Sequence, residues 1–447
     1  MKIRIKKGLN IPIAGKPEGE VISLHTPKRL ALNLDPFDDI RFKVLVHIGD
    51  QVKIGQPLVE SKTTPGMFFV SPAGGRVAEI RRGLKRRLID MVVEVADKEE
   101  FTQHPPLQNY TQETLLKRLM EAGGFPHIRM RPFNLVAMPS KLPKTIFVKA
   151  VESAPFTPSA ELQVAGNEES FAAGLKALAS LATIHLVYDE RSVCKSFIKA
   201  SHVERHTVLG PHPAGNVSLH IHKINPIRDH QECVWTLSTL DVITIGELVE
   251  KGRYFTQRVI GVGGSGLLKG AACYLKGRAG HPIDELGNKR LEEKLLCLIS
   301  GDPLTGTKIE LSDFLGFYHT AFSALPISTK RESFHFFRFG FRKFSATRTY
   351  ISGFMKKRLY PFDTNQHGEE RAFIDGSVYD KVMPMRIPTM QLVKAVLSED
   401  YELAQQLGLL EVAPEDLALP TFICPSKIEM MDILKLGLHR YSKELGF

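Results

Sequence analysis

The chain has 447 residues, 43% hydrophobic and 24% charged, a composition typical of a soluble globular protein with about three domains. Its 59 lysines and arginines outnumber its 49 acidic residues, and the net charge of +10 favours an anionic partner such as nucleic acid, a membrane surface or an acidic protein. No stretch approaches the ~18 apolar residues of a membrane helix, and the N-terminus lacks the apolar core of a signal peptide, so we expect a cytoplasmic protein.

Residues 42–95 are predicted to form a small barrel of short strands. Val44 and Val46 lie in an alternating, β-branched segment, and Gly49 and Gly55 mark tight turns. The pattern is similar to a lipoyl- or biotinyl-type barrel-sandwich domain.

The lysine that carries the cofactor in such domains lies at the tip of a tight hairpin. Here the tip reads Thr64-Pro65-Gly66, and Lys62 precedes it without the usual flanking residues. The sequence therefore predicts an unmodified scaffold without biotin or lipoate. A carrier modified at Lys62 is the alternative.

A cluster of basic residues, here called the basic hairpin, falls within the predicted barrel. Its charged members are Arg81, Arg82, Lys85, Arg86 and Arg87. A solvated hairpin and a face that docks on a partner or a membrane both fit this pattern. No aromatic residue interleaves the cluster, which disfavours nucleic acid as the ligand.

An α/β region is predicted after a polar linker over 98–111. Thr111 is a suitable N-cap for a helix that ends at Gly123. A strand over 145–150, a helix over 168–181 and a strand over 184–188 follow. Residues 258–306 are rich in predicted strand, and the clearest helices of the remainder span 390–407 and 427–445.

Several short motifs are weak indications of a site. Residues 261–266 match GxGxxG, and Glu285 has the spacing of a ribose-binding acid, but the glycine-rich sequence over 267–280 is unsuited to the helix that a dinucleotide site needs. Two pairs of histidines have ligand-like spacing if they share a helix face or a strand face: His202 with His206, and His220 with His222. Neither pair has a third ligand at a suitable spacing, so no metal site is predicted.

The five cysteines are isolated from one another, without a CxxC pair, which predicts free thiols and no iron–sulfur site. They are Cys194, Cys233, Cys273, Cys297 and Cys424. No Ser-His-Asp set, Cys-His set, paired-carboxylate motif or phosphate loop is present, so no catalytic residue is predicted.

The segment 334–344 contains six phenylalanines and three basic residues, and it is predicted to be a strand or ribbon. It is either core on one face or an apolar surface ringed by cations. In the second case Phe337, Phe339 and Phe341 dock on a partner or a membrane.

Several long motifs in one order carry a family resemblance. They read KKGLNIPIAGKPE, GDQVKIGQPL, SPAGGRVAEI, GPHPAGNVSLHIH and EDLALPTFICPSK. From end to end, the chain resembles the A subunits of the sodium-translocating NADH:quinone oxidoreductases, and it shares its domain order with the C subunits of Rnf complexes.

The resemblance implies an α+β multidomain fold. Its parts are an N-terminal region with a lipoyl-like barrel-sandwich (1–105), an α/β Rossmann-like domain (106–257), a β-grasp soluble-ligand-binding domain (258–310) and a mainly helical C-terminal domain (311–447).

The resemblance also implies a peripheral subunit on the cytoplasmic side of a six-subunit membrane complex that oxidises NADH, reduces quinone and exports sodium. Flavins and iron centres belong to other subunits, and this subunit is linked to quinone. Arg131 and Phe133 lie in an R-x-R-P-aromatic stretch similar to a family segment tied to the quinone; a packing loop between domains is the other interpretation. An adaptor that docks on a membrane transporter, without a redox role, is the alternative function.

Overall fold

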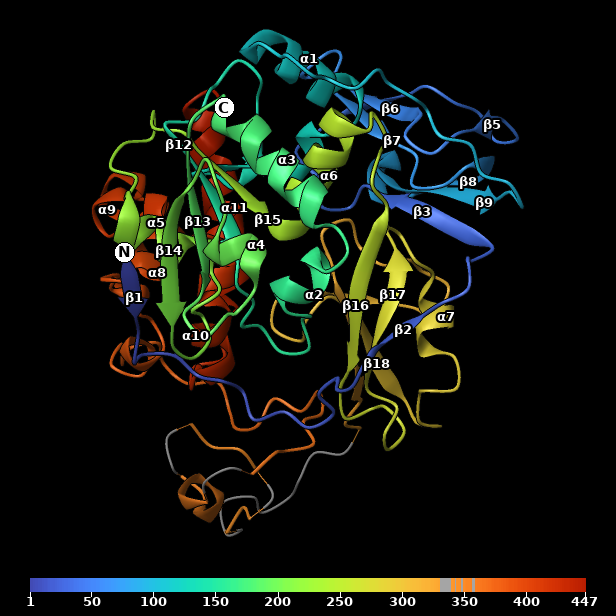
Figure 1. The fold of residues 1–447 in the computed structure, drawn as a ribbon. Helices are drawn as coiled ribbons and strands as arrows, with labels where there is room; N and C mark the ends of the chain where they lie inside the picture. The colour runs from blue at the N-terminus through green and yellow to red at the C-terminus, as the bar shows by residue number, and fades with distance from the viewer. Residues whose placement is uncertain (330–338, 342, 347–348, 356–357) are drawn as a thin grey trace.

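The computed structural model describes residues 1–329, 339–341, 343–346, 349–355 and 358–447. Its strands form four sheets, and helices cover both faces of the largest sheet. The predicted α+β, multidomain class is confirmed at this level (Figure 1).

Two small antiparallel sheets form the N-terminal barrel. One has the order β3 (Arg29–Asn33), β9 (Leu88–Val95), β8 (Gly75–Arg82) and β5 (Gln51–Val52), and the other has the order β4 (Phe42–Val44), β6 (Pro57–Ser61) and β7 (Phe68–Val70). Gly49 and Gly55 have φ angles of 100° and 81°, which confirms the predicted turns. The short helix η1 (Leu84–Arg86) lies between β8 and β9.

A seven-stranded sheet forms the centre of the α/β region. Its order is β1 (Lys2–Arg4), β14 (Glu204–Leu209), β13 (Thr183–Asp189), β12 (Thr145–Ala150), β15 (Val234–Ser238), β10 (Arg129–Arg131) and β11 (Leu135–Val136). The first five strands in this order are parallel, and β10 and β11 are antiparallel to their neighbours. The apolar strands read as continuous hydrophobic runs because both faces are covered.

Helices from the middle of the chain cover the sheet. They are α1 (Gln112–Glu121), η2 (Phe125–His127), α2 (Ala160–Val164), α3 (Glu168–Ala179), α4 (Lys195–Ile198), α5 (Val217–Ile224) and α6 (Thr239–Glu250). Thr111 caps α1 as predicted. Helices α3 and α6 pack very closely, since a Cβ atom on Gly246 would lie 1.7 Å from the Ser170 carbonyl oxygen.

A six-stranded sheet follows. Its order is β19 (Thr307–Ile309), β18 (Leu296–Ser300), β20 (Ala321–Pro326), β16 (Gln257–Gly263), β17 (Cys273–Arg278) and β2 (Val21–Ser23), and α7 (Ile283–Gly287) packs beside it. The N-terminal segment therefore reaches two sheets, with β1 on the seven-stranded sheet and β2 on this one, before it enters the barrel (Figure 1).

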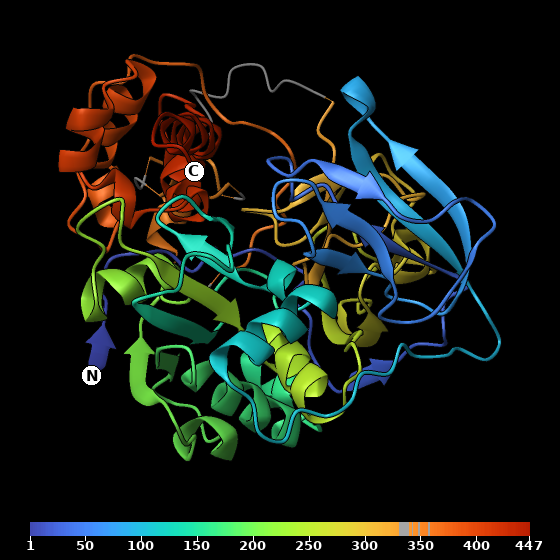
Figure 2. The same ribbon diagram turned by 90° about the horizontal axis from the view of Figure 1, so that it is seen from above.

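The C-terminal region packs on the face of the seven-stranded sheet opposite α3 and α6 (Figure 2). Its helices are η4 (Ile351–Phe354), η5 (Tyr379–Lys381), α8 (Thr389–Leu397), α9 (Tyr401–Gln406), η6 (Leu409–Glu411), η7 (Pro414–Leu417), α10 (Ala418–Ile423) and α11 (Met430–Glu444). The single helix predicted over 390–407 is wrong. Two helices, α8 and α9, meet at Glu399, whose φ of 59° breaks the run.

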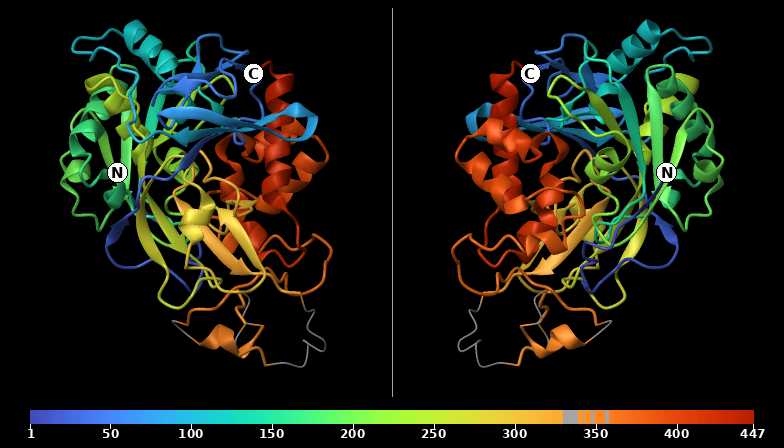
Figure 3. Two further views of the ribbon diagram at one scale, coloured as in Figure 1. Left: turned by 90° about the vertical axis from the view of Figure 1, so that its right-hand side faces the viewer. Right: turned by 90° about the vertical axis from the view of Figure 1, so that its left-hand side faces the viewer.

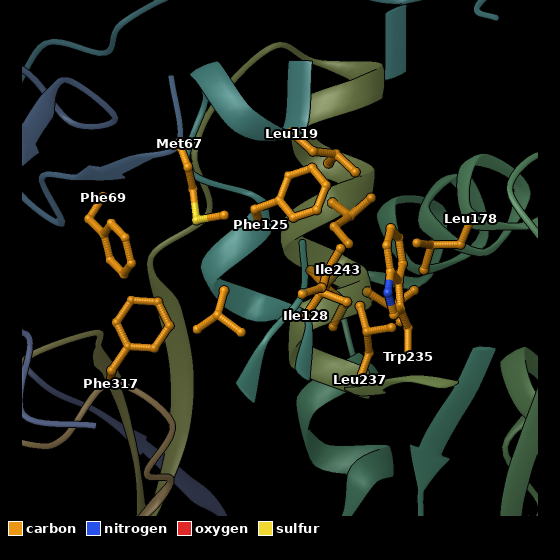
Figure 4. Packing of buried hydrophobic residues seen from close by; sticks show 14 of the residues in the cluster. Met67, Phe69, Leu119, Phe125, Ile128, Leu178, Trp235, Leu237, Ile243 and Phe317 are labelled. Atoms are coloured by element: carbon orange, nitrogen blue, oxygen red, sulfur yellow. The ribbon is translucent and has the colours of Figure 1, made fainter. Parts of the chain in front are cut away.

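One apolar core joins the barrel, the α/β region and the edge of the six-stranded sheet. Phe69 of the barrel, Phe317 and Trp235 of β15 belong to the same buried cluster (Figure 4). The ring of Phe37 bridges Phe69 and Phe317, at centroid distances of 4.8 and 5.1 Å. Figure 3 shows the barrel and the six-stranded sheet stacked beside the C-terminal helices.

Candidate functional site

A cavity of about 990 Å³ lies where the regions meet. Its walls include the residues that follow the carboxyl ends of β12, β14 and β15, together with the loop after β3, the loop after β18 and one side of α11. Crevices at the carboxyl ends of parallel strands are the usual ligand sites of open α/β sheets. The volume is at the upper end of the range for small-molecule pockets.

Three aromatic side chains line this cavity: Phe133, Phe317 and Tyr318. The Phe133 ring packs against Phe447 of the C-terminus, 4.7 Å between centroids. The Tyr318 hydroxyl donates to the Pro126 carbonyl oxygen at 2.6 Å, and burial raises the pKa of Tyr318 to about 12. These contacts hold the Phe133 and Tyr318 rings in fixed positions.

The guanidinium of Arg129 provides a cation next to the Tyr318 ring. It lies over the Tyr318 ring, 5.1 Å from the centroid, and donates to the Asn134 carbonyl oxygen at 2.6 Å. Because an arginine held in this way keeps its position, it is a ready partner for an electron-rich ligand oxygen.

A group of polar residues from the ends of β12 and β14 also lines the cavity. Lys149 at the end of β12 pairs with Glu152 at 2.9 Å. The Ser153 hydroxyl accepts a hydrogen bond from the Gly215 N–H at 2.8 Å and lies 2.9 Å from Nδ1 of His212. Burial lowers the pKa of His212 to about 4, and its Nε2 has no partner among the described residues. This uncharged imidazole is a buried polar group whose Nε2 is unsatisfied in the described part of the chain.

The two residues predicted to contact quinone have different places. Phe133 lines the cavity, whereas Arg131 does not. Arg131 is 1% exposed, and its Nη1 donates to the Ser218 hydroxyl at 2.7 Å. It is therefore buried away from the cavity surface, and the predicted quinone contacts stay predictions.

The basic hairpin is only partly a free cationic surface. Arg81 bonds Glu79 at 2.9 Å and the Ser312 carbonyl oxygen at 3.1 Å, and its guanidinium lies over the Phe314 ring. Arg87 pairs with Asp35. Lys85 and Arg86 lie in η1, where Leu84 is 93% exposed, and Arg82 ends the preceding strand β8. The exposed tip is thus the part of this hairpin that fits the docking prediction.

The phenylalanine-rich strip divides into described and undescribed parts. Phe337 lies outside the described residues. Phe339 and Phe341 are 68% and 48% exposed, with ring centroids 6.1 Å apart. Phe344 instead packs against Phe422 of α10. The strip therefore combines an apolar surface with a core contact, and its docking role stays a prediction.

The structure arranges the histidines differently from both predicted pairs. His220 and His222 lie on a helix, α5, so the predicted strand face is wrong. His220 donates to the Ala214 carbonyl oxygen, and His222 contacts Glu411. His202 lies in the turn before β14, so it shares no helix face with His206.

A cluster that local spacing could not reveal brings His206 beside His185 and Glu204. Burial lowers the pKa of both histidines, that of His206 to about 4, so both rings are uncharged at neutral pH. His185 comes from the neighbouring strand, and only the pairing of β13 with β14 places the three side chains together.

The remaining sequence motifs have structural roles. The glycine-rich turn after β16 leads into the antiparallel strand β17, so no helix opens there, as predicted. The five cysteines are free thiols, as predicted.

Among the helices in the described ranges, none has the length and apolarity to cross a bilayer.

Comparison with known proteins decides the family. The NqrA N-terminal barrel-sandwich hybrid domain matches residues 3–96, and the NqrA second alpha/beta domain matches residues 110–254. The A subunit of the Na(+)-translocating NADH-quinone reductase from Chlamydia caviae is 39% identical, and the match covers 100% of this chain and 98% of that protein. The chain belongs to this NqrA family. Proteins of the same name from Chlamydia pneumoniae (100% of this chain, 98% of that protein) and Yersinia pseudotuberculosis (99% and 100%) are 40% and 34% identical.

The family match supports the barrel-sandwich and the α/β domain that the sequence predicts. Among solved structures, a NAD+-reducing [NiFe]-hydrogenase aligns with a TM-score of 0.36 and 10% identity. The alignment covers 75% of this chain and 61% of that chain.

Proposed function

We propose that this chain is a peripheral subunit, on the cytoplasmic side of the membrane, of a sodium-translocating NADH:quinone reductase, and that it binds quinone in the central cavity. The observation that carries the proposal is that Phe133, Phe317 and Tyr318 all line one cavity of about 990 Å³. The names of the relatives support the assembly.

A quinone head group is a flat ring with two oxygen acceptors, so it needs apolar faces and a few donors. Phe133 provides such a face, and Arg129 lines the same cavity. His212 also lines it, and its buried Nε2, without a partner among the described residues, could donate to a quinone oxygen after a small rearrangement. Arg131 contributes indirectly, because it holds the strand that precedes Phe133.

The rest of the assembly follows from the resemblance. In this proposal the tip of the basic hairpin and the strip of Phe339 and Phe341 dock on the integral membrane subunits and the flavin-bearing subunits. Flavins and iron centres reside on those partners, and Lys62 carries neither biotin nor lipoate. We also assign the α/β domain as Rossmann-like, the six-stranded sheet as the β-grasp domain and the C-terminal region as a helical domain.

Photolabelling of the intact complex with an azido-quinone tests the quinone site. We expect label on the peptides that contain Phe133, and about tenfold less label in Phe133→Leu, which removes the ring but keeps an apolar side chain. Phe197→Leu is the matched control, since Phe197 is equally buried but packs against Phe171 under α3, away from the cavity. Label confined to other subunits, or equal label in both variants, would overturn the site.

Purification of the native complex tests the assembly separately. Co-purification with flavin-bearing redox subunits supports the proposal, and co-purification with an export pump supports the adaptor alternative. An intact mass that matches the unmodified chain supports the assignment of Lys62, whereas an added lipoyl or biotinyl mass contradicts it.

A further inference from the structure

Three side chains with metal-ligand chemistry converge at the start of β13 and β14. His185 and Glu204 are direct partners across the two parallel strands, and His206 follows Glu204 by two residues. Because side chains alternate between the faces of a strand, all three lie on one face of the sheet. The site is at the amino ends of these strands, whereas the central cavity is at the carboxyl ends.

The distances among the three ligand atoms fit a single small cation. Nδ1 of His185 lies 3.1 Å from Nε2 of His206 and 3.2 Å from Oε2 of Glu204, and the last two atoms are 3.9 Å apart. Tetrahedral zinc with bonds of about 2.0–2.2 Å places its ligand atoms about 3.3 Å apart. The cluster therefore needs little adjustment to bind such an ion.

The hydrogen bonds available to the cluster leave it incomplete. Nδ1 of His185 has two close neighbours, Nε2 of His206 and Oε2 of Glu204, and one ring proton can serve only one of them. The remaining contact is then without a hydrogen bond. A cation accepts all three lone pairs at once, which removes this conflict.

The surroundings hold one of the ligands in place. His185 is 5% exposed and packs on the Phe147 ring, 4.8 Å between centroids, and its Nε2 has no partner among the described residues. Nδ1 of His206 accepts a hydrogen bond from the Met1 amino group at 3.1 Å, and a cation on Nε2 would replace this contact, because the ring proton must then move to Nδ1. Glu204 is 60% exposed, so a water molecule can reach the fourth position.

We propose that His185, Glu204 and His206 form a binding site for a divalent transition-metal ion of the zinc type, which joins β13 to β14. The set of two imidazoles and one carboxylate with an open position suits Zn²⁺ or Co²⁺ rather than Mg²⁺ or Ca²⁺, which prefer all-oxygen ligands. This inference replaces the sequence-based expectation of no metal and is independent of the proposed function.

Metal titration of the purified full chain tests the site. We expect the apo chain to bind one Zn²⁺, and to bind Co²⁺ with the intense visible absorption of a tetrahedral site. Glu204→Gln and His206→Gln should weaken Zn²⁺ binding by more than about 100-fold, beyond the 10–100-fold effect of residues outside the ligand set. Mg²⁺ should produce no change.

The control variant is His202→Asn. His202 is an exposed histidine four residues from His206, and its φ of 62° suits asparagine. This variant should bind Zn²⁺ as the unaltered chain does. Glu204 is on the surface, so Glu204→Gln should keep the fold, which circular dichroism checks. Failure of the unaltered chain to bind Zn²⁺, or equal binding by Glu204→Gln and His202→Asn, would overturn the proposal.

Discussion

The side chain of Arg131 is one of the largest that is fully buried in this fold. Burial lowers its pKa, and the nearby carboxylates of Glu415 and Asp416 oppose that effect. Burial, and then the charge of Glu415, raises the pKa of Asp416 to about 6. Arg131 therefore supplies a positive charge from β10 close to the carboxylates of the C-terminal region, and removal of one member of such a buried set leaves the others uncompensated.

We predict that Arg131→Met lowers the free energy of unfolding by about 3 kcal/mol at neutral pH, because Asp416 loses its buried counter-charge. The loss should be smaller near about pH 5, where Asp416 is protonated in both proteins. Urea unfolding followed by the fluorescence of Trp235, the single tryptophan, measures it.

A second substitution separates this electrostatic effect from lost packing. Asp416→Asn in the Arg131→Met background should recover part of the stability, since no buried carboxylate then remains without a partner. Equal losses at both pH values, or no recovery in the double variant, would show that the two residues do not interact.

At the level of single residues, Phe133 comes from the family resemblance as a quinone contact; it lines the cavity, and the contact itself stays a prediction. His212 and Lys149 were not selected, because they reach the same cavity from the ends of different strands. His185 was missed for the same reason, as its partners are on the adjacent strand.

At the scale of elements, capping and periodicity predicted several boundaries well. The strand over 145–150 is found as predicted, and the predicted helix over 168–181 corresponds to α3. The spacing of His220 and His222 fits a strand face, but the segment is helix α5, whose apolar residues pack with the sheet and the C-terminal region. Asp400 caps the N-terminus of α9, and an aspartate at this position is a sequence signal for the start of a second helix.

Strand β9 contains a buried acid that makes the stability of the barrel depend on pH. Asp90 is 4% exposed and accepts a hydrogen bond from the Asn33 side chain at 2.9 Å. Burial raises its pKa to about 6, whereas the unfolded chain has a value of about 3.9. The native state therefore binds this proton more tightly, and stability falls as pH rises from about 4 to about 6.

We predict that Asp90→Asn removes this pH dependence and raises the free energy of unfolding by about 2 kcal/mol above about pH 7. Asparagine keeps the oxygen that accepts from Asn33 and carries no charge. Urea unfolding across about pH 4–8 measures the change. The control variant Asp97→Asn, at an exposed position, should have the same pH profile of stability as the unaltered chain. If Asp90→Asn is less stable than the unaltered chain at neutral pH, burial of the Asp90 charge does not destabilise the barrel.

At the scale of the whole molecule, contacts between modules come from chain segments distant in sequence. The N-terminal segment adds a strand to each of the two largest sheets. Arg278 of β17 joins the six-stranded sheet to the barrel: it donates to Glu99 at 2.5 and 3.0 Å and to the Pro72 carbonyl oxygen at 2.6 Å. Sequence patterns describe each module separately and contain no signal for such pairings.

We predict that Arg278→Gln lowers the free energy of unfolding by about 3 kcal/mol, because the Glu99 carboxylate, which is 17% exposed, loses a bidentate ion pair. The barrel and the six-stranded sheet should then unfold separately. Calorimetry should show a new transition at lower temperature. Arg76→Gln is the matched control: its pair with Glu94 is 2.7 Å long but more than half exposed, so its loss should cost less than about 1 kcal/mol. A single transition with an equally small shift in both variants would mean that apolar packing around Phe37, rather than this ion pair, holds the two modules together.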